Sequence, residues 1–178
     1  MSIYKLPAVI NFINRFYSLL HPEQYHGWGR TKNYFEGWYY KVVTSDETKA
    51  FAFIPGIAMA ESGQKQAFIQ VLDGISKSAK YYRFDSGEFK VSPKEFNLLI
   101  SDNTLSINQI QLNLPSIKGK MKFINQVPWP TSWRSPGIMG PYSFIPFMEC
   151  YHDILSIDHS PAPIHGCRLT TSVIPVFH

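Results

Sequence analysis

The chain has little cysteine, little charge and no long apolar run. Two cysteines, Cys150 and Cys167, occur among 178 residues, which excludes a disulfide-rich secreted scaffold, because such scaffolds use several bridges in a shorter chain. No stretch is long and apolar enough to predict a membrane-spanning helix. Polar residues at positions 11, 14 and 15 interrupt the early apolar run that a signal peptide needs. We therefore expect a reduced, cytoplasmic protein.

Several functional motifs are also missing. The sequence has no glycine-rich phosphate loop, no nucleophile elbow and no closely spaced cysteine pair for a metal. The formal net charge is +4, and the lysines are scattered between predicted strands. Nucleic-acid binding needs a concentrated basic face, so we predict no nucleic-acid partner. Weak attraction to an anionic membrane is compatible with this charge and leaves peripheral membrane association open.

Aromatic residues are what the chain has in abundance. Phe, Trp and Tyr make up 15% of the sequence, whereas charged residues make up 17%. Rings suit strands, and disordered chains are charged and poor in rings, so this composition favours a folded β-rich protein. The length is sufficient for one domain with a substantial core.

One helix is predicted, over residues 7–20. Pro7 suits the first helical turn, and the Leu20-His21-Pro22 step ends the helix. One face carries the apolar residues at helical spacing, which are Val9, Phe12, Ile13, Phe16, Leu19 and Leu20. The helix either packs against a sheet or lies on a membrane surface, although a single arginine on its polar face is few cations for the second role.

Short strands separated by turns fill most of the remaining sequence. The predicted strands cover 35–43, 50–54, 67–72, 80–84, 89–91, 96–100, 104–107, 109–114, 116–123, 141–157 and part of 167–178. Pro55 and Gly56 are expected to stop the second strand, and Asp73-Gly74 is a turn signal. This spacing predicts an all-β antiparallel meander, hence a barrel or a sandwich. Residues 126–139 form a proline-rich loop whose tryptophans are either functional or plug one end.

Two of these strands each carry a carboxylate among rings. Strand alternation places Glu36, Trp38 and Tyr40 on one face of the first, and Glu149 and Tyr151 on one face of the second. A buried carboxylate is costly without water or a partner, so the pattern predicts a lined cavity. The carboxylates are then general acids, the rings stabilise a cation, or the residues only hydrogen-bond each other across strands.

A third group, His152, Asp158 and His159, invites a metal interpretation. Its spacing matches no standard metal motif, so we predict no metal and favour a structural or acid–base role. The candidate catalytic residues are Glu149, Glu36, Asp158 and His152. The candidate ligand-binding residues are Trp38, Tyr40, Trp133 and Tyr151.

These blocks resemble the tocopherol cyclase family, including its bacterial members. The matching stretches are Phe35-Glu36-Gly37-Trp38-Tyr39-Tyr40-Lys41-Val42, residues 140–152 and Ser156-Ile157-Asp158-His159. The resemblance implies a lipocalin-like barrel or strongly curved sheet and cofactor-free ring closure of a prenylated quinol. A proton adds to the prenyl double bond, and the phenol oxygen attacks the resulting tertiary cation. The assignment of Glu36 or Glu149 as the acid rests on chemistry alone.

The expected organisation is a helical segment at 1–30, a β domain at 31–159 and an atypical tail at 160–178. Family members carry a second β-rich half that is absent here, so the chain is interpreted as a truncated member. It then binds a hydrophobic isoprenoid or quinol and catalyses ring closure, or it is a non-catalytic lipid-binding or structural fragment. The sheet edge left by the missing half is expected to pair with another chain.

Overall fold

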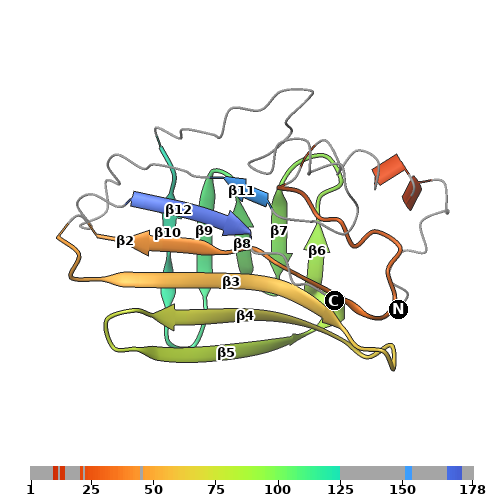
Figure 1. Ribbon diagram of the computed structural model, residues 1–178, viewed down its shortest axis with the longest axis horizontal. Coiled ribbons are helices and arrows are strands. Elements are labelled where there is room, and N and C mark those ends of the chain that lie inside the picture. The colour runs from red at the N-terminus through yellow and green to blue at the C-terminus, as the bar shows by residue number, and fades with distance from the viewer. Residues whose placement is uncertain are drawn as a thin grey trace.

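A computed structural model describes residues 10–11, 13–14, 21, 23–44, 46–124, 151–153 and 168–173. These residues form two antiparallel sheets (Figure 1). The first sheet contains β1 (Tyr34–Gly37), β2 (Tyr40–Val43), β3 (Ala50–Met59), β4 (Lys65–Asp73), β5 (Ser78–Asp85), β11 (Tyr151–Asp153) and β12 (Arg168–Val173). The second contains β6 (Phe89–Val91), β7 (Asn97–Ile100), β8 (Asn103–Ser106), β9 (Gln109–Asn113) and β10 (Lys118–Lys122), and a 3-10 turn (Ser86–Glu88) links the two sheets.

In the first sheet the strands lie in the order β11-β12-β2-β3-β4-β5, with β1 also paired to β3. The β1 and β2 pairings share one register, because Gly37 opposes Gly56 and Tyr40 opposes Phe53. Between them, the Trp38 N–H donates to the Pro55 carbonyl at 2.9 Å. Pro55 has no N–H to return that bond, so the ladder is interrupted without a shift of register.

The prediction that Pro55 and Gly56 end a strand is therefore wrong. β3 continues through both residues to Met59. The missing donor points toward Trp38, whereas the pairing of β3 with β4 uses the alternate residues and is unbroken over nine positions. Proline is tolerated in a strand where its absent N–H costs no ladder bond on the other side.

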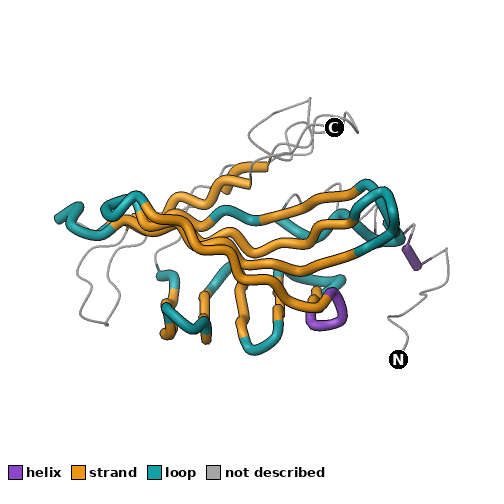
Figure 2. The backbone as a smooth tube through the Cα atoms, turned by 90° about the horizontal axis from the view of Figure 1, so that it is seen from below, coloured by secondary structure: helices purple, strands orange, loops and turns teal. Residues whose placement is uncertain are grey.

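The second sheet packs across the inner face of the first, so that the fold is a two-sheet sandwich. Figure 1 shows β6–β10 running across the direction of β3–β5, and Figure 2 shows them as a layer on one side. The shared core contains Ile69, Leu98, Ile100 and Leu105, each fully buried. The Tyr82 hydroxyl from β5 forms a short hydrogen bond with the Ser116 hydroxyl and ties the sheets together.

The all-β antiparallel prediction is confirmed, but neither sheet closes into a barrel within the described residues. Barrel closure needs a hydrogen-bonded return to the first strand, and the second sheet instead packs face to face with the first. The helix predicted at 7–20 is not shown: the described residues contain no α-helix element, although Ile10, Asn11, Ile13 and Asn14 have helical backbone. The remainder of that helix and the loop 126–139 lie outside the described residues.

The outer face of the first sheet carries a row of stacked rings over two glycines. Phe35 stacks on Phe68 with ring centroids 5.4 Å apart, and Phe68 stacks on Tyr81 at 5.3 Å. We call these three residues the outer aromatic row. A Cβ on Gly56 would lie 2.5 Å from the Phe68 ring, so the row needs glycine beneath it. Tyr81, at the end of the row, is 48% exposed.

Candidate functional site

The segment that precedes β1 lies against the end of the sandwich and is fixed by its own hydrogen bonds. The Gln24 N–H donates to the His21 carbonyl in a tight turn at 3.0 Å. The buried Gln24 side chain donates to the Lys94 carbonyl at 3.2 Å, which links the segment to the turn between β6 and β7. The Trp38 indole N–H donates to the Glu23 carbonyl at 3.0 Å. These contacts place Tyr25 and His26 beside the inner face of β1.

Glu36 is a largely buried carboxylate surrounded by donors. Its side chain is 11% exposed, and that of His26 is 10% exposed. The His26 backbone N–H lies 3.1 Å from both carboxylate oxygens, and the Tyr34 hydroxyl donates to Oε2 at 2.6 Å. The His26 ring Nδ1 lies 3.1 Å from Oε1.

This arrangement favours one of the three roles considered for Glu36. The observed hydrogen bonds join the Glu36 carboxylate to His26 and to Tyr34. Hydrogen bonding to neighbouring elements is therefore the role with observed contacts. Such a carboxylate is suited to hold an imidazole in one orientation, as the third member of an acid–base group does.

Tyr25, the residue before His26, packs among rings of both sheets, with Tyr34 of β1 on one side and Phe89 of β6 on the other. Its ring makes edge-on contacts with Trp28 at 5.3 Å and with Phe89 at 5.6 Å. Burial first, and the negative charge of Glu36 second, raise the pKa of Tyr25 well above its usual range. Tyr25 therefore remains protonated at neutral pH. The sequence analysis missed Tyr25 and His26, and the cluster of rings at residues 25–28 was the available signal.

Trp38 and Tyr40 lie deeper, where rings from both sheets meet. Trp38 is 3% exposed and packs on Phe96 with centroids 5.5 Å apart. Tyr40 is 1% exposed and its ring lies between Phe96 at 6.4 Å and Phe123 at 6.3 Å. Its hydroxyl is buried without a hydrogen-bond partner among the described residues. Burial raises the pKa of Tyr40 well above its usual value, so the group is a neutral donor.

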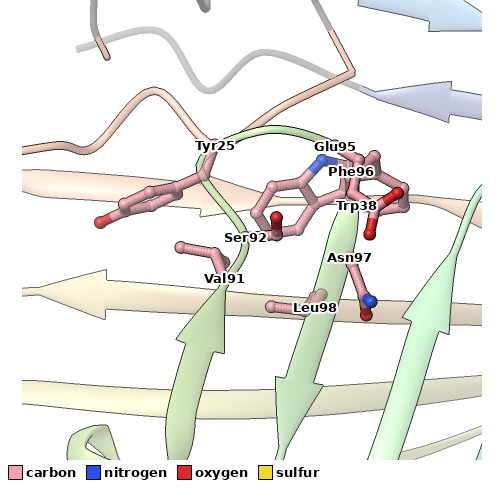
Figure 3. A pocket seen from close by; sticks show the side chains of 8 residues that line it. All are labelled: Tyr25, Trp38, Val91, Ser92, Glu95, Phe96, Asn97 and Leu98. Atoms are coloured by element: carbon pink, nitrogen blue, oxygen red, sulfur yellow. The ribbon is translucent and has the colours of Figure 1, made fainter. Parts of the chain in front are cut away.

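A shallow depression lies above this cluster (Figure 3). It is lined by Tyr25, Trp38, Val91, Ser92, Glu95, Phe96, Asn97 and Leu98. The depression itself has no room for a water molecule. This depression is too small to be the lined cavity that the sequence predicts, which stays a prediction. The candidate ligand-binding residues Trp38 and Tyr40 lie side by side in the packed core.

The second aromatic block is described only at β11. Tyr151 and His152 belong to that strand, where they oppose Val173 and Ser172 of β12. β12 in turn pairs with β2, with Thr171 opposite Tyr40. The two blocks predicted from the sequence therefore contribute strands to one sheet, in which β12 lies between β11 and β2. Glu149, Asp158 and Trp133 lie outside the described residues.

No family model, curated protein or solved structure matches this chain. Within the described residues, no group of three His, Cys, Asp or Glu side chains could hold a metal ion. A separate search of the same residues finds no helix long and apolar enough to cross a bilayer.

Proposed function

We propose that this chain is a tocopherol cyclase-like protein that binds a prenylated quinol or a related isoprenoid between its two sheets. The observation that carries the proposal is the Tyr40 hydroxyl, which is buried among rings and donates to no described acceptor. A donor left unpaired in the core costs about 1–3 kcal/mol. An oxygen of a bound quinol would accept this hydrogen and remove that cost.

The neighbouring rings supply the rest of a site for such a ligand. Phe96 lies between Trp38 and Tyr40 and belongs to the turn 92–96, which is closed by the Ser92 N–H donating to the Asn97 carbonyl at 3.0 Å. Because Phe96 also packs on Tyr40, an outward movement of Phe96 would open the depression of Figure 3 toward Tyr40. The indole and phenol faces then bound an apolar slot that suits a prenyl chain.

Ring closure in this slot would be balanced without a cofactor. A proton adds to one carbon of the prenyl double bond, the phenol oxygen bonds to the tertiary cation, and the phenol proton returns to a base. Trp38 and Tyr40 would stabilise the cation through their ring faces. Glu149 is our candidate for the proton donor, with Asp158 and His152 as further candidates. Glu36 would orient His26 through the observed contacts and would act as a positioning residue.

A binding experiment tests the proposal directly. Geranylgeranyl- and phytyl-quinol are titrated into the full chain while tryptophan fluorescence is recorded. We expect saturable quenching and about tenfold weaker binding for Tyr40→Phe, since one buried hydrogen bond to the ligand is lost. Tyr82→Phe is the matched control, because its hydroxyl bonds Ser116 away from the depression. Equal affinity of wild type and Tyr40→Phe would remove Tyr40 from the site.

Turnover separates the enzyme from its non-catalytic alternative. The tightly filled space between the sheets specifically favours a fragment that binds lipid or serves as structure without catalysis. If the chain is an enzyme, chromatography of the quinol incubation detects the cyclised isomer, and Glu149→Gln abolishes it while binding is retained. Binding without any cyclised product in wild type would establish the alternative.

We further propose that the N-terminal segment associates with membrane surfaces as an amphipathic helix. Ile10 and Ile13 have helical backbone and are 39% and 58% exposed, and the chain has a formal net charge of +4. Exposed apolar helix residues and a positive charge both favour an anionic interface. Co-sedimentation with phosphatidylserine vesicles should fall for an Ile10→Ser and Ile13→Ser double variant. Unchanged sedimentation would exclude this segment as the anchor.

A further inference from the structure

We propose that two copies of this chain associate through their β5 strands, which pair antiparallel about a two-fold axis at Tyr81. This inference is independent of the ligand proposal. It rests on three features of the described residues, namely the unpaired edge of β5, the open end of the outer aromatic row and the charges along the strand.

The first feature is the edge itself. β5 (Ser78–Asp85) is the last strand of the first sheet, with β4 on one side and no described strand on the other (Figure 1). It has eight residues, whereas β1, β6 and β11 have four or fewer. The edge strand β10 carries Lys118, Lys120 and Lys122, and such lysines discourage pairing. β5 is therefore the longest edge strand of the described residues, and it carries one lysine, Lys80, where the shorter β10 carries three.

The direction of the backbone groups on β5 follows from bonds elsewhere in the sheet. The Trp38 N–H bonds the Pro55 carbonyl, so the odd-numbered residues of β3 point their backbone N–H and C=O groups toward β1 and β2. The even-numbered residues of β3 therefore point these groups toward β4. The registers of β3 with β4 and of β4 with β5 carry this alternation across the sheet. In β5 the even-numbered residues, such as Tyr82, point their backbone N–H and C=O groups toward β4. The N–H and C=O groups of Ala79, Tyr81 and Arg83 consequently point outward.

The bond at the end of the strand agrees with this count. Asp85 is the next outward residue, and its N–H is taken by the Glu88 carboxylate at 3.1 Å within a capping box. The edge is thus closed at Asp85 and open over the three outward residues before it. Antiparallel pairing with a second copy would form about six backbone hydrogen bonds there, two for each hydrogen-bonded pair.

The second feature fixes the register. Tyr81 ends the outer aromatic row, with Phe68 stacked on its inner side and 48% of the residue exposed. The Gln66 amide donates to the Tyr81 hydroxyl at 3.2 Å and holds the ring in place. Pairing Tyr81 with Tyr81 of the second copy would join the two aromatic rows into one. Stacking of aromatic cross-strand pairs stabilises such a contact.

The third feature is the distribution of charge, which agrees with this register. With Tyr81 on the axis, Ser78 opposes Phe84 of the second copy at each end of the paired strands. Lys80 opposes Tyr82 and Arg83 opposes Ala79, so no like charges face each other. Shifting the axis to Lys80 or to Arg83 would place two cations directly opposite, which destabilises a pair of strands.

Solution measurements with the full chain test the association. Sedimentation velocity across a concentration series should show a reversible dimer, weak because the buried area is small. Ala79→Pro removes the outward N–H of residue 79 while sparing the bonds to β4, and should weaken the dimer at least about tenfold. Circular dichroism confirms that this variant folds. A sample that stays monomeric at all concentrations would overturn the proposal.

Cross-linking tests the register without relying on that variant. In a background with Cys150 and Cys167 changed to serine, Tyr81→Cys should form an intermolecular disulfide under mild oxidation. The two Cα atoms of a hydrogen-bonded pair are about 5.5 Å apart, within the range that a disulfide spans.

Ala79→Cys and Arg83→Cys provide matched controls. Each alone should not cross-link, because copies of the same residue lie about 13 Å apart along the strands. A mixture of the two variants should cross-link. If Arg83→Cys alone cross-links, or if Tyr81→Cys does not while a dimer is present, the association uses another surface and the proposal fails.

Discussion

Replacing Tyr40 by phenylalanine removes one oxygen atom from the centre of the sandwich and should make the protein more stable. The Tyr40 ring is 1% exposed and packs against Phe96 and Phe123. Phenylalanine keeps these ring contacts, because only the hydroxyl is lost. That hydroxyl has no partner among the described residues, so the substitution breaks no hydrogen bond within that part of the chain.

The magnitude follows from the desolvation of the hydroxyl. In the unfolded chain the hydroxyl bonds water, and in the fold no described residue replaces that bond, at a cost of about 1–3 kcal/mol. We expect the free energy of unfolding to rise by about 1–2 kcal/mol, since the small void left by the oxygen offsets part of the gain. The thermal midpoint should rise by about 2–4 °C for each kcal/mol.

Urea unfolding followed by tryptophan fluorescence measures this effect. The midpoint should move to higher urea with an unchanged slope, as a pure change in stability requires. Tyr82→Phe is the control and should lose about 1 kcal/mol, because the Tyr82 hydroxyl bonds Ser116. If Tyr40→Phe lowers the stability as Tyr82→Phe does, the Tyr40 hydroxyl has an acceptor and the argument from an unpaired donor is refuted.

Three further substitutions test other parts of the structure. Gly56→Ala should destabilise by about 3 kcal/mol in urea unfolding, because its Cβ would lie 2.5 Å from the Phe68 ring and from the Glu36 carbonyl. Glu36→Gln should cost about 2 kcal/mol, since it weakens hydrogen bonds to a charged acceptor. Asp73→Asn tests a turn in which hydrogen bonds, first from the Ser76 hydroxyl and then from backbone N–H groups, lower the pKa of Asp73 below 3.8. Because the pKa of Asp73 is lower in the folded state, its ionised side chain stabilises the fold above pH 3.8, and this contribution is lost as acid protonates it. The difference in the free energy of unfolding between wild type and Asp73→Asn should therefore shrink as the pH falls below 3.8.

Two of these substitutions have a control at a more open position. Gly87→Ala should be nearly neutral, because a Cβ there meets only the Asp85 carboxylate at 3.3 Å. Glu95→Gln changes an exposed carboxylate and should leave stability unchanged. If Gly56→Ala is as mild as Gly87→Ala, the outer aromatic row does not need its glycine. If the difference between Asp73→Asn and wild type is independent of pH, the Asp73 hydrogen bonds do not form in solution.

The strands were predictable from sequence because alternation and turn residues act locally. The Asp73-Gly74 turn and the strand after Asp85 lie where the pattern predicted them. Pro55 was misjudged because its effect depends on which neighbouring strand faces its missing N–H, and a single sequence does not show that. The preference for a sandwich over a barrel likewise depends on contacts between distant strands.

The environment of Glu36 was predictable only in part. Strand alternation correctly placed Glu36 on the same face as Trp38 and Tyr40, which became the inner face of the sheet. His26 comes from an irregular segment with no periodicity, so nothing in the spacing indicated that its ring and backbone would both meet the carboxylate. The cost of burying a carboxylate predicted that Glu36 needs a partner, but only the fold shows that the partner is His26.

The missing N–H of Pro55 divides the ladder that β3 forms with β1 and β2 into two halves. Tyr34–Gly37 can detach from β3 with Glu36 while Tyr40–Val43 remains hydrogen-bonded on both sides. Amide hydrogens of the first half should therefore exchange with solvent sooner than those of the second, without opening of the core. We therefore expect β1 to separate from β3 at Pro55 first, so that the segment with Glu36 opens before the buried rings of the core do.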